Sequence, residues 1–126
     1  MKTGRMSALL FGLMILSLAA CQTAQVAGTT KPTSVNLKPA QSHEDCAEVT
    51  PDNELTYSFM STAPVDFNIH YHEGASITYP VQKTRVSSDS GTFRPDKKAL
   101  YCLMWTNNNP QRVNVEYSMH VGSRSK

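Results

Sequence analysis

Apolar side chains recur at every second position through most of the chain after residue 54. The segments with this alternation are residues 55–59, 65–71, 77–81, 101–105 and 113–121. A period of two places successive side chains on opposite faces of a strand, so each segment has one apolar face. Residues 100–105 are apolar on both faces, which predicts a central strand buried on both sides. No long helical pattern interrupts these segments, and we therefore predict an all-β domain.

Residues that favour chain reversal separate the predicted strands. Gly, Pro, Asn, Asp and Ser supply the backbone conformations that turns require. They gather at 61–64, 73–74, 87–91, 95–96 and 107–110. Short strands with turns at this spacing predict a small antiparallel β-sandwich. We expect it to span residues 44–122 and to be followed by a disordered tail at 123–126.

The first 20 residues carry the pattern of an export signal. Two basic residues precede an apolar run over 6–18, which at about a dozen residues is shorter than the ~20 that a permanent transmembrane helix needs. The run ends in Leu18-Ala19-Ala20-Cys21. This ending resembles the lipobox of bacterial lipoproteins, in which the cysteine is diacylated and becomes the new N-terminus after cleavage. The alternative is an ordinary signal peptide followed by a chance cysteine.

A linker rich in Thr, Ala, Gln, Ser and Lys follows Cys21. Residues 22–42 contain two prolines and no aromatic residue, so they bury too little apolar surface to offset the entropy lost on ordering. We therefore expect a signal peptide over 1–20 and a lipidated, flexible tether over 21–43. With a span of ~5 to 6 Å times the square root of about twenty residues, the tether would lift the domain roughly 25 Å from the membrane.

The charge balance gives no sign of a nucleic-acid partner. The chain has 12 Lys and Arg against 10 Asp and Glu, and Lys2 and Arg5 leave with the signal peptide, so the mature chain is balanced. Interspersed charges of both signs provide no electrostatic footprint for nucleic acid or for a polybasic membrane contact. We expect membrane attachment through the acyl chains instead. Gln22 stands where Asp would indicate inner-membrane retention in enteric-type bacteria, which favours the outer membrane, facing the periplasm.

The two remaining cysteines form an even pair in a compartment that permits oxidation. Of 3 cysteines, Cys21 is assigned to lipid, and we predict a disulfide between Cys46 and Cys102. A metal-binding pair and free thiols are the alternatives, although neither cysteine lies in a Cys-x-x-Cys motif. The disulfide would stabilise the domain by about 4 kcal/mol.

Three segments carry a resemblance to a known family. They are residues 65–69 (VDFNI), residues 91–93 (GTF) leading into 101–107 (YCLMWTN), and residues 113–117 (VNVEY). Together they resemble the GOLD domain family, a β-sandwich of secretory-pathway cargo receptors and some lipid carriers. In the cargo-receptor branch one cysteine opens the domain and another lies in the aromatic strand, and Cys46 and Cys102 occupy the matching places. The coiled coil and cytoplasmic tail of that branch have no counterpart here, so the resemblance implies a binding module and not vesicle trafficking.

Two histidines on one strand face are the sharpest candidate for chemistry. Side chains two residues apart on a strand share a face. The polar residues that would lie together are Asp66, Asn68, His70 and His72. Neutral imidazoles suit copper or zinc, and His120 would add a third ligand only if the last strand lies beside the histidine strand. The alternative is a polar outer face that happens to contain histidines.

Catalytic motifs are missing from the sequence. There is no nucleophile elbow, no phosphate-binding glycine loop and no His-Glu-x-x-His helix, so we expect no enzymatic activity and no cofactor. The predicted function is that of a lipid-anchored envelope lipoprotein with a non-catalytic binding domain, whose partner is an envelope protein or a lipid. The alternative is a periplasmic lipoprotein that binds copper or zinc through His70 and His72.

Overall fold

The computed structural model describes residues 31–124, and these residues form strands joined by short connections. The strands are β1 (Thr33–Leu37), β2 (Ser42–Val49), β3 (Asn53–Glu73), β4 (Ser76–Phe93), β5 (Ala99–Thr106) and β6 (Val113–Ser123). All of their pairings are antiparallel. The predicted all-β class is therefore confirmed. The described part of the chain contains no helix that is long and apolar enough to cross a membrane.

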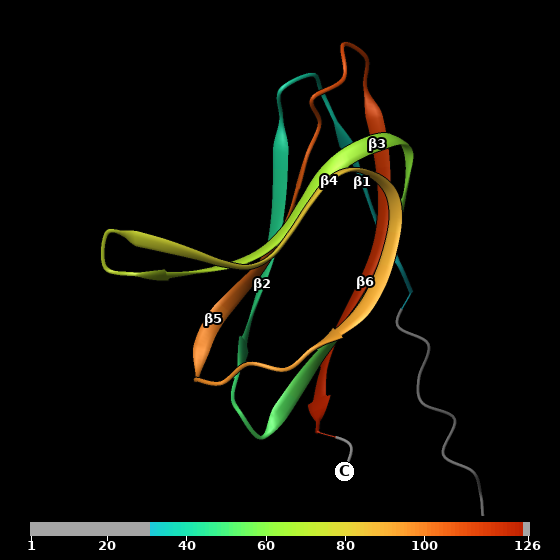
Figure 1. Ribbon diagram of the computed structural model, residues 1–126. Helices are drawn as coiled ribbons and strands as arrows, with labels where there is room; N and C mark the ends of the chain where they lie inside the picture. Colours follow the sequence, from blue (N-terminus) through green and yellow to red (C-terminus); the bar gives the residue numbers. More distant parts are fainter. Residues whose placement is uncertain (1–30, 125–126) are drawn as a thin grey trace, which may run out of the picture.

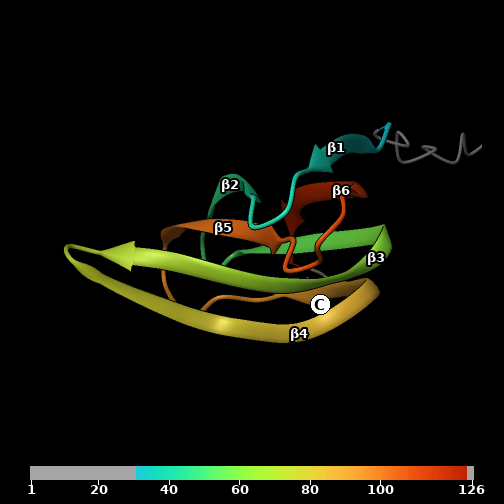
Figure 2. The same cartoon turned by 90° about the horizontal axis from the view of Figure 1, so that it is seen from above.

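One long hairpin, formed by β3 and β4, links the two layers of the fold (Figure 1). Residues 53–61 of β3 pair with β6, residues 66–70 pair with β5, and β4 follows the opposite edge of β3. β1 lies beside β6, and β2 lies beside β5. The first layer therefore contains β1, β6 and the first part of β3, and the second layer contains β2, β5 and the second part of β3. Figure 2 shows β4 along one side of this sandwich, with β1 and β2 on the other.

Three of the predicted turns are confirmed as connections between strands, at 73–74, 95–96 and 107–110. The other two are wrong, because residues 61–64 lie inside β3 and residues 87–91 lie inside β4. The glycine in the second segment has another role. A Cβ atom at Gly91 would lie 2.9 Å from Tyr57 Oη, so glycine allows the tyrosine to approach the backbone of β4.

The residues that we expected to reverse the chain at 61–64 bend it instead. The pairing of β3 with β4 shifts register in this region, where Pro64 has no N–H to donate to the ladder. On β4, Arg85 has a φ of 54°, and its N–H donates to Asp66 Oδ1 at 3.0 Å. This bond satisfies a backbone group at the irregularity. The hairpin thus passes from one layer to the other without ending.

Ordered structure begins earlier than the expected tether over 21–43 allows. The tether prediction is wrong from β1 onward, because Thr33–Leu37 pairs with β6 along its whole length. Leu37 is 2% exposed, and Val35 packs against the core. A five-residue edge strand is too short for its alternation to stand out in a polar linker. The predicted signal peptide and the first part of the predicted tether lie outside the described residues.

The chain also remains ordered further toward its end than we expected. β6 includes Ser123, and the N–H of Arg124 donates to the Asp52 carbonyl at 3.0 Å. The predicted disordered tail at 123–126 is therefore wrong for its first two residues. The last two lie outside the described part of the chain.

The buried side chain of Asn107 fastens β1 to the rest of the fold. Its Nδ2 donates to the carbonyls of Leu37 and Lys38, both at 3.1 Å, and to that of Gln111 at 2.9 Å. Its Oδ1 accepts from the N–H of Asn109 at 2.8 Å. One amide thus joins the β1–β2 loop to the β5–β6 loop, and a buried polar group of this kind is costly to leave unpaired.

An aromatic core fills the space between the layers. Trp105 of β5 is fully buried, and its ring centroid lies 4.4 Å from that of Tyr117 on β6 and 5.6 Å from that of Phe67 on β3. Such ring pairs contribute about 0.5–1.5 kcal/mol each beyond burial. β5 is an internal strand, as predicted. The expectation that both of its faces are buried is only partly right, because Leu100 on the outer face is 58% exposed.

A disulfide joins β2 to β5 and confirms the predicted pairing. Cys46 and Cys102 face each other in the strand register, with their Cα atoms 4.0 Å apart. The alternatives of a metal-binding pair and of free thiols are therefore wrong. With a sequence separation of 56, loop closure contributes about 4 kcal/mol to stability, a large share of the ~5–15 kcal/mol typical of a domain.

The packing of β1 can be tested with two leucine substitutions. Leu37→Ala should lower the free energy of unfolding by about 2–4 kcal/mol, because it leaves a cavity in the core. Leu100→Ala should change it by less than about 0.5 kcal/mol, because that side chain is exposed. Urea unfolding followed by circular dichroism measures both. An effect of Leu37→Ala on the free energy of unfolding as small as that of Leu100→Ala would show that β1 is not part of the cooperative fold.

Candidate functional site

The outer face of the second layer brings the predicted polar residues together. The register places Cys46, Cys102 and His70 in one row across β2, β5 and β3. Glu44, Met104 and Asn68 form the next row, and Ile77 of β4 lies opposite His72. We call this surface the histidine face. Its residues from the four strands are Glu44, Cys46, Asn68, His70, His72, Ile77, Tyr79, Leu100, Cys102 and Met104.

His70 is the buried centre of the histidine face. It is 3% exposed, and its Nδ1 lies 2.8 Å from Asn68 Oδ1. Because an amide oxygen only accepts, Nδ1 donates this hydrogen bond, and the neutral ring keeps a lone pair on Nε2. That nitrogen lies 3.5 Å from Glu44 Oε2. Burial lowers the pKa of His70, Glu44 opposes this shift and His72 adds to it, so the net direction favours the neutral ring.

Glu44 and His70 meet across an intervening strand. β5 lies between β2 and β3, and two strand spacings amount to about 9.6 Å. The β5 residue in the row of His70 is Cys102, a small side chain that is bonded to Cys46. This leaves room above the disulfide for the longer Glu44 and His70 side chains to approach each other.

Aromatic and apolar groups surround the buried histidine. The ring of His72 lies edge-on to His70 at a centroid distance of 5.2 Å, and the ring of Tyr79 lies at 5.6 Å. Ile77, Tyr79 and Leu100 are exposed large hydrophobic residues on this face. Tyr79 also lines a groove of about 320 Å³, together with Asn68 and Met104 of the same face. The histidine face therefore has a polar centre with exposed apolar side chains around it.

His120 is not brought to the other two histidines. The last strand does lie beside β3, as that prediction required, but it pairs with residues 53–61, and His120 faces Thr56 in the first layer. Within residues 31–124, the group of three possible metal-ligating side chains is Glu44, His70 and Cys102. The sequence analysis missed Glu44. Its position two residues before Cys46 becomes informative only once the disulfide fixes the register of β2.

A second polar group lies inside the sandwich, between β2 and β6. Tyr117 Oη donates to Asp45 Oδ2 at 2.9 Å and lies 3.0 Å from His43 Nε2. Burial, followed by the hydrogen bond to Asp45 and its charge, raises the pKa of Tyr117 to about 12. The neighbouring Trp105 Nε1 is buried without a hydrogen-bond partner in the described part of the chain. This group holds a neutral phenol between the layers.

A third polar group joins β3 to β4. Asp89 Oδ2 accepts from Tyr57 Oη at 3.0 Å and pairs with Lys83 Nζ at 2.6 Å. Burial and the hydrogen bond to Asp89 raise the pKa of Tyr57 to about 12. Burial would raise the pKa of Asp89, but the bonds from Lys83 and Tyr57 outweigh it and lower that pKa. The phenols of Tyr57 and Tyr117 are thus neutral at physiological pH.

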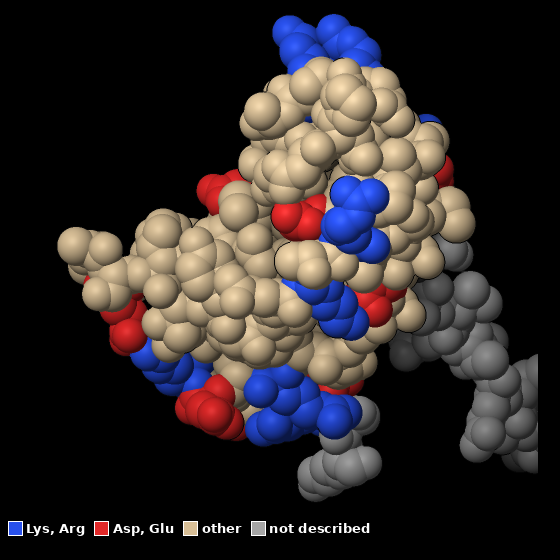
Figure 3. All heavy atoms as spheres, turned by 45° about the horizontal axis from the view of Figure 1, so that its top comes forward, with Lys and Arg blue, Asp and Glu red and all other residues tan. Residues whose placement is uncertain are grey.

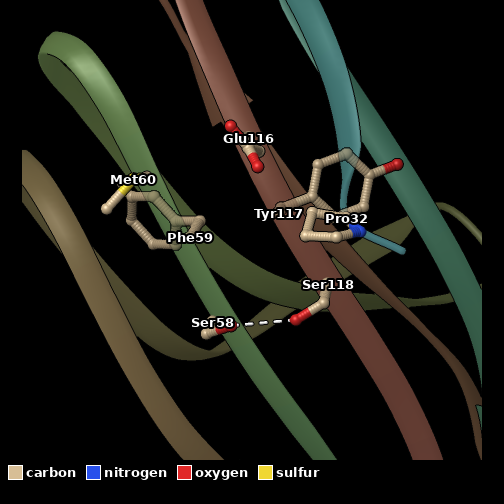
Figure 4. Close-up of a pocket in the computed structure, with 7 residues that line it drawn as sticks. All are labelled: Pro32, Ser58, Phe59, Met60, Glu116, Tyr117 and Ser118. Atoms are coloured by element: carbon tan, nitrogen blue, oxygen red, sulfur yellow. Dashed lines mark hydrogen bonds between the residues drawn. The ribbon is translucent and has the colours of Figure 1, made fainter. Parts of the chain in front are cut away.

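Two further hollows lie away from the histidine face. One, of about 200 Å³, opens on the first layer and is shown in Figure 4, where Ser58 and Ser118 are joined by a 2.8 Å hydrogen bond. Glu116 is its one ionisable carboxylate. The other, of about 310 Å³, lies where Lys97 sits 4.4 Å above the centre of the Tyr71 ring. Neither hollow places a histidine beside a carboxylate.

Comparisons with known proteins found a weak structural similarity and no related sequence. No protein-family model matches the chain, and no curated protein is similar to it in sequence. Among solved structures, the chain is similar to a de novo designed double-stranded β-helix determined by solution NMR, with a TM-score of 0.42 and 15% sequence identity. The match covers 72% of this chain and 100% of that one. This likeness carries no information about function.

The raised pKa values of Tyr57 and Tyr117 can be tested by alkaline titration. Tyr57 and Tyr117 should remain protonated at pH 11 in the folded domain, because the pKa of each is about 12. Unfolded tyrosine ionises near pH ~10, so the free energy of unfolding should hold up to about pH 10 and fall between pH 10 and 12. Ultraviolet absorbance of tyrosinate and urea unfolding at each pH measure these effects.

The substitution Tyr117→Phe provides the control for this titration. It should reduce the loss of stability between pH 10 and 12, since it removes one of the two phenols whose pKa is raised to about 12. Ionisation of all 5 tyrosines by pH 11 in a chain that is still folded would contradict the assignment.

Proposed function

We propose that this chain is a lipid-anchored envelope lipoprotein whose β-sandwich binds a partner and catalyses no reaction. The proposed anchor is Cys21, at the end of Leu18-Ala19-Ala20-Cys21. The proposed setting is the outer membrane, facing the periplasm, as Gln22 favours. β1 begins at Thr33, so the 12 residues that follow the anchor reach at most about 43 Å. The anchor would therefore keep the domain close to the membrane surface.

The domain is proposed to be GOLD-like because the three sequence segments lie on strands that pair with one another, and residues 65–69 pair directly with 101–107. Residues 65–69, 101–107 and 113–117 belong to β3, β5 and β6 or their ends, and β3 pairs with both of the others. The two cysteines that match the cargo-receptor branch are bonded. These features support a compact module that makes protein or lipid contacts.

The observation that supports a binding role is the group of exposed apolar side chains around the polar centre of the histidine face. Three of the four exposed large hydrophobic residues in the described chain, Ile77, Tyr79 and Leu100, lie on it. Exposed apolar groups gathered on one face, with polar groups among them, mark interaction surfaces. Figure 3 shows, on the side that it presents, tan surface with blue and red side chains scattered over it.

A protein partner fits this face better than a lipid surface. Glu48 and Glu73 are each paired with a lysine, at Lys98 and Lys97, so the surroundings of the face are close to neutral. A membrane-binding patch would instead carry an excess of Lys and Arg for anionic headgroups. We therefore propose that the face binds another envelope protein through apolar contacts.

The anchor is tested by the substitution Cys21→Ser. It should abolish incorporation of a fatty-acid analogue, because the acyl chains need the cysteine thiol. The matched control is the double variant Cys46→Ser/Cys102→Ser, which should still be labelled because it keeps Cys21 and loses only the two cysteines of the disulfide. Labelling that persists in Cys21→Ser would disprove the anchor.

The binding face is tested by photo-crosslinking in cells. A photoreactive residue at position 100 should capture a partner protein, and one at position 60 should not. Leu100 and Met60 are a matched pair, since they are 58% and 63% exposed and lie in different layers of the sandwich. The captured product is identified by mass spectrometry. Capture from both positions alike, or from neither, would count against the histidine face as the binding surface.

A further inference from the structure

We propose that Glu44, His70 and His72 form a binding site for a divalent transition-metal ion, Zn²⁺ or Cu²⁺. This inference is independent of the proposed function, because it concerns the polar centre of the histidine face and needs no partner protein. It also differs from the histidine set expected from the sequence. Glu44 takes the place of His120, which lies in the first layer opposite Thr56.

The distance between the first two ligands matches a shared metal ion. Glu44 Oε2 and His70 Nε2 are 3.5 Å apart. An ion at ~2.0–2.1 Å from each atom would see them at an angle of about 115°, close to the tetrahedral geometry of zinc. Without a cation or a proton between them, a carboxylate oxygen and an imidazole lone pair at this distance repel each other. A bound cation would convert this repulsion into two coordinate bonds.

Asn68 already orients His70 for such a role. The ring donates from Nδ1 to Asn68 Oδ1 at 2.8 Å, which fixes the tautomer with its lone pair on Nε2. In metal sites the second ring nitrogen of a histidine ligand is held in this way by an acceptor, and loss of that acceptor typically weakens metal binding 10–100-fold. Asn68 is therefore a positioning residue and not a ligand.

The proposed third ligand is His72, and the site is open to solvent. The side chain of His72 lies outside the group of Glu44, His70 and Cys102, whose ligand atoms lie within 4.8 Å of one another, so His72 has to turn toward the ion to bind it. His72 is exposed, and its ring lies edge-on to that of His70 at a centroid distance of 5.2 Å. The side chain of Glu44 is 50% exposed, so an ion can enter from solvent, and water can fill the remaining coordination position. Imidazole nitrogen with carboxylate oxygen suits Zn²⁺ and Cu²⁺.

Cys102 lies beside this site without being a ligand. Its Sγ is within 4.8 Å of the ligand atoms of Glu44 and His70, but it is bonded to Cys46. A disulfide sulfur is a poor ligand compared with a thiolate. The proposed ligand set in the oxidised protein is therefore two nitrogens, one carboxylate oxygen and water.

The test is calorimetric titration of the full chain, purified in detergent without a histidine tag and with its disulfide verified by thiol assay. Zn²⁺ and Cu²⁺ are titrated separately into micromolar protein. We expect one ion per chain, an affinity at least tenfold lower for Glu44→Gln, and an affinity 10–100-fold lower for Asn68→Ala. Because Glu44 is half exposed, the variant Glu44→Gln should fold normally, and circular dichroism checks this.

Two matched controls separate this site from nonspecific binding. Glu48→Gln removes a carboxylate from the same strand face, where it pairs with Lys98, and His120→Asn removes an exposed histidine from the other layer. Both should bind the metal as the unaltered chain does. The ion should also raise the thermal unfolding midpoint of the unaltered chain and not that of Glu44→Gln. Absence of binding by the unaltered chain, or equal binding by Glu44→Gln and Glu48→Gln, would overturn the proposal.

Discussion

The fold depends on how one long strand divides its hydrogen bonds. β3 offers the same edge first to β6 and then to β5, while β4 occupies its other edge throughout. A strand of 21 residues that remained straight would give a flat sheet with two faces to cover. The bend near Pro64 turns the two halves of the apolar face toward each other, so that Phe59 and Phe67 pack at a ring centroid distance of 4.9 Å. The core exists because this strand bends at a local irregularity and then resumes its pairing with β4.

The sequence predicted the strands wherever one face is apolar. The alternation in 55–59, 65–71, 101–105 and 113–121 corresponds to inward-facing core residues. It did not reveal that the first two segments belong to one strand. Ser, Pro and Gly favour both reversals and irregularities within strands, and the outcome depends on which partner edges are available. That information is in the tertiary structure and not in the residues at 61–64.

The sequence did not predict strand β2, for a different reason. Its inward side chains include His43 and Asp45, and its outward side chains include Glu44 and Glu48, so both faces are polar and a pattern of apolar positions cannot detect it. The inward groups are tolerated because Tyr117 provides their hydrogen-bond partner. The shared strand face of His70 and His72 was predictable from spacing alone. The approach of Glu44 was not, because it depends on the undetected strand and on the small residue that separates it from β3.

Because β2 contributes few apolar side chains to the core, the disulfide is also what attaches this strand firmly to the sheet. Val49 is the one residue of this strand in the buried core, so hydrophobic burial alone attaches β2 poorly, and the bond from Cys46 to Cys102 supplies what is missing. In a reducing compartment the chain lacks that bond. There, β2 would be loosely held. On the proposed export route, oxidation of Cys46 and Cys102 after transport would complete the folding of the domain, so that folding would depend on the redox state of the surroundings.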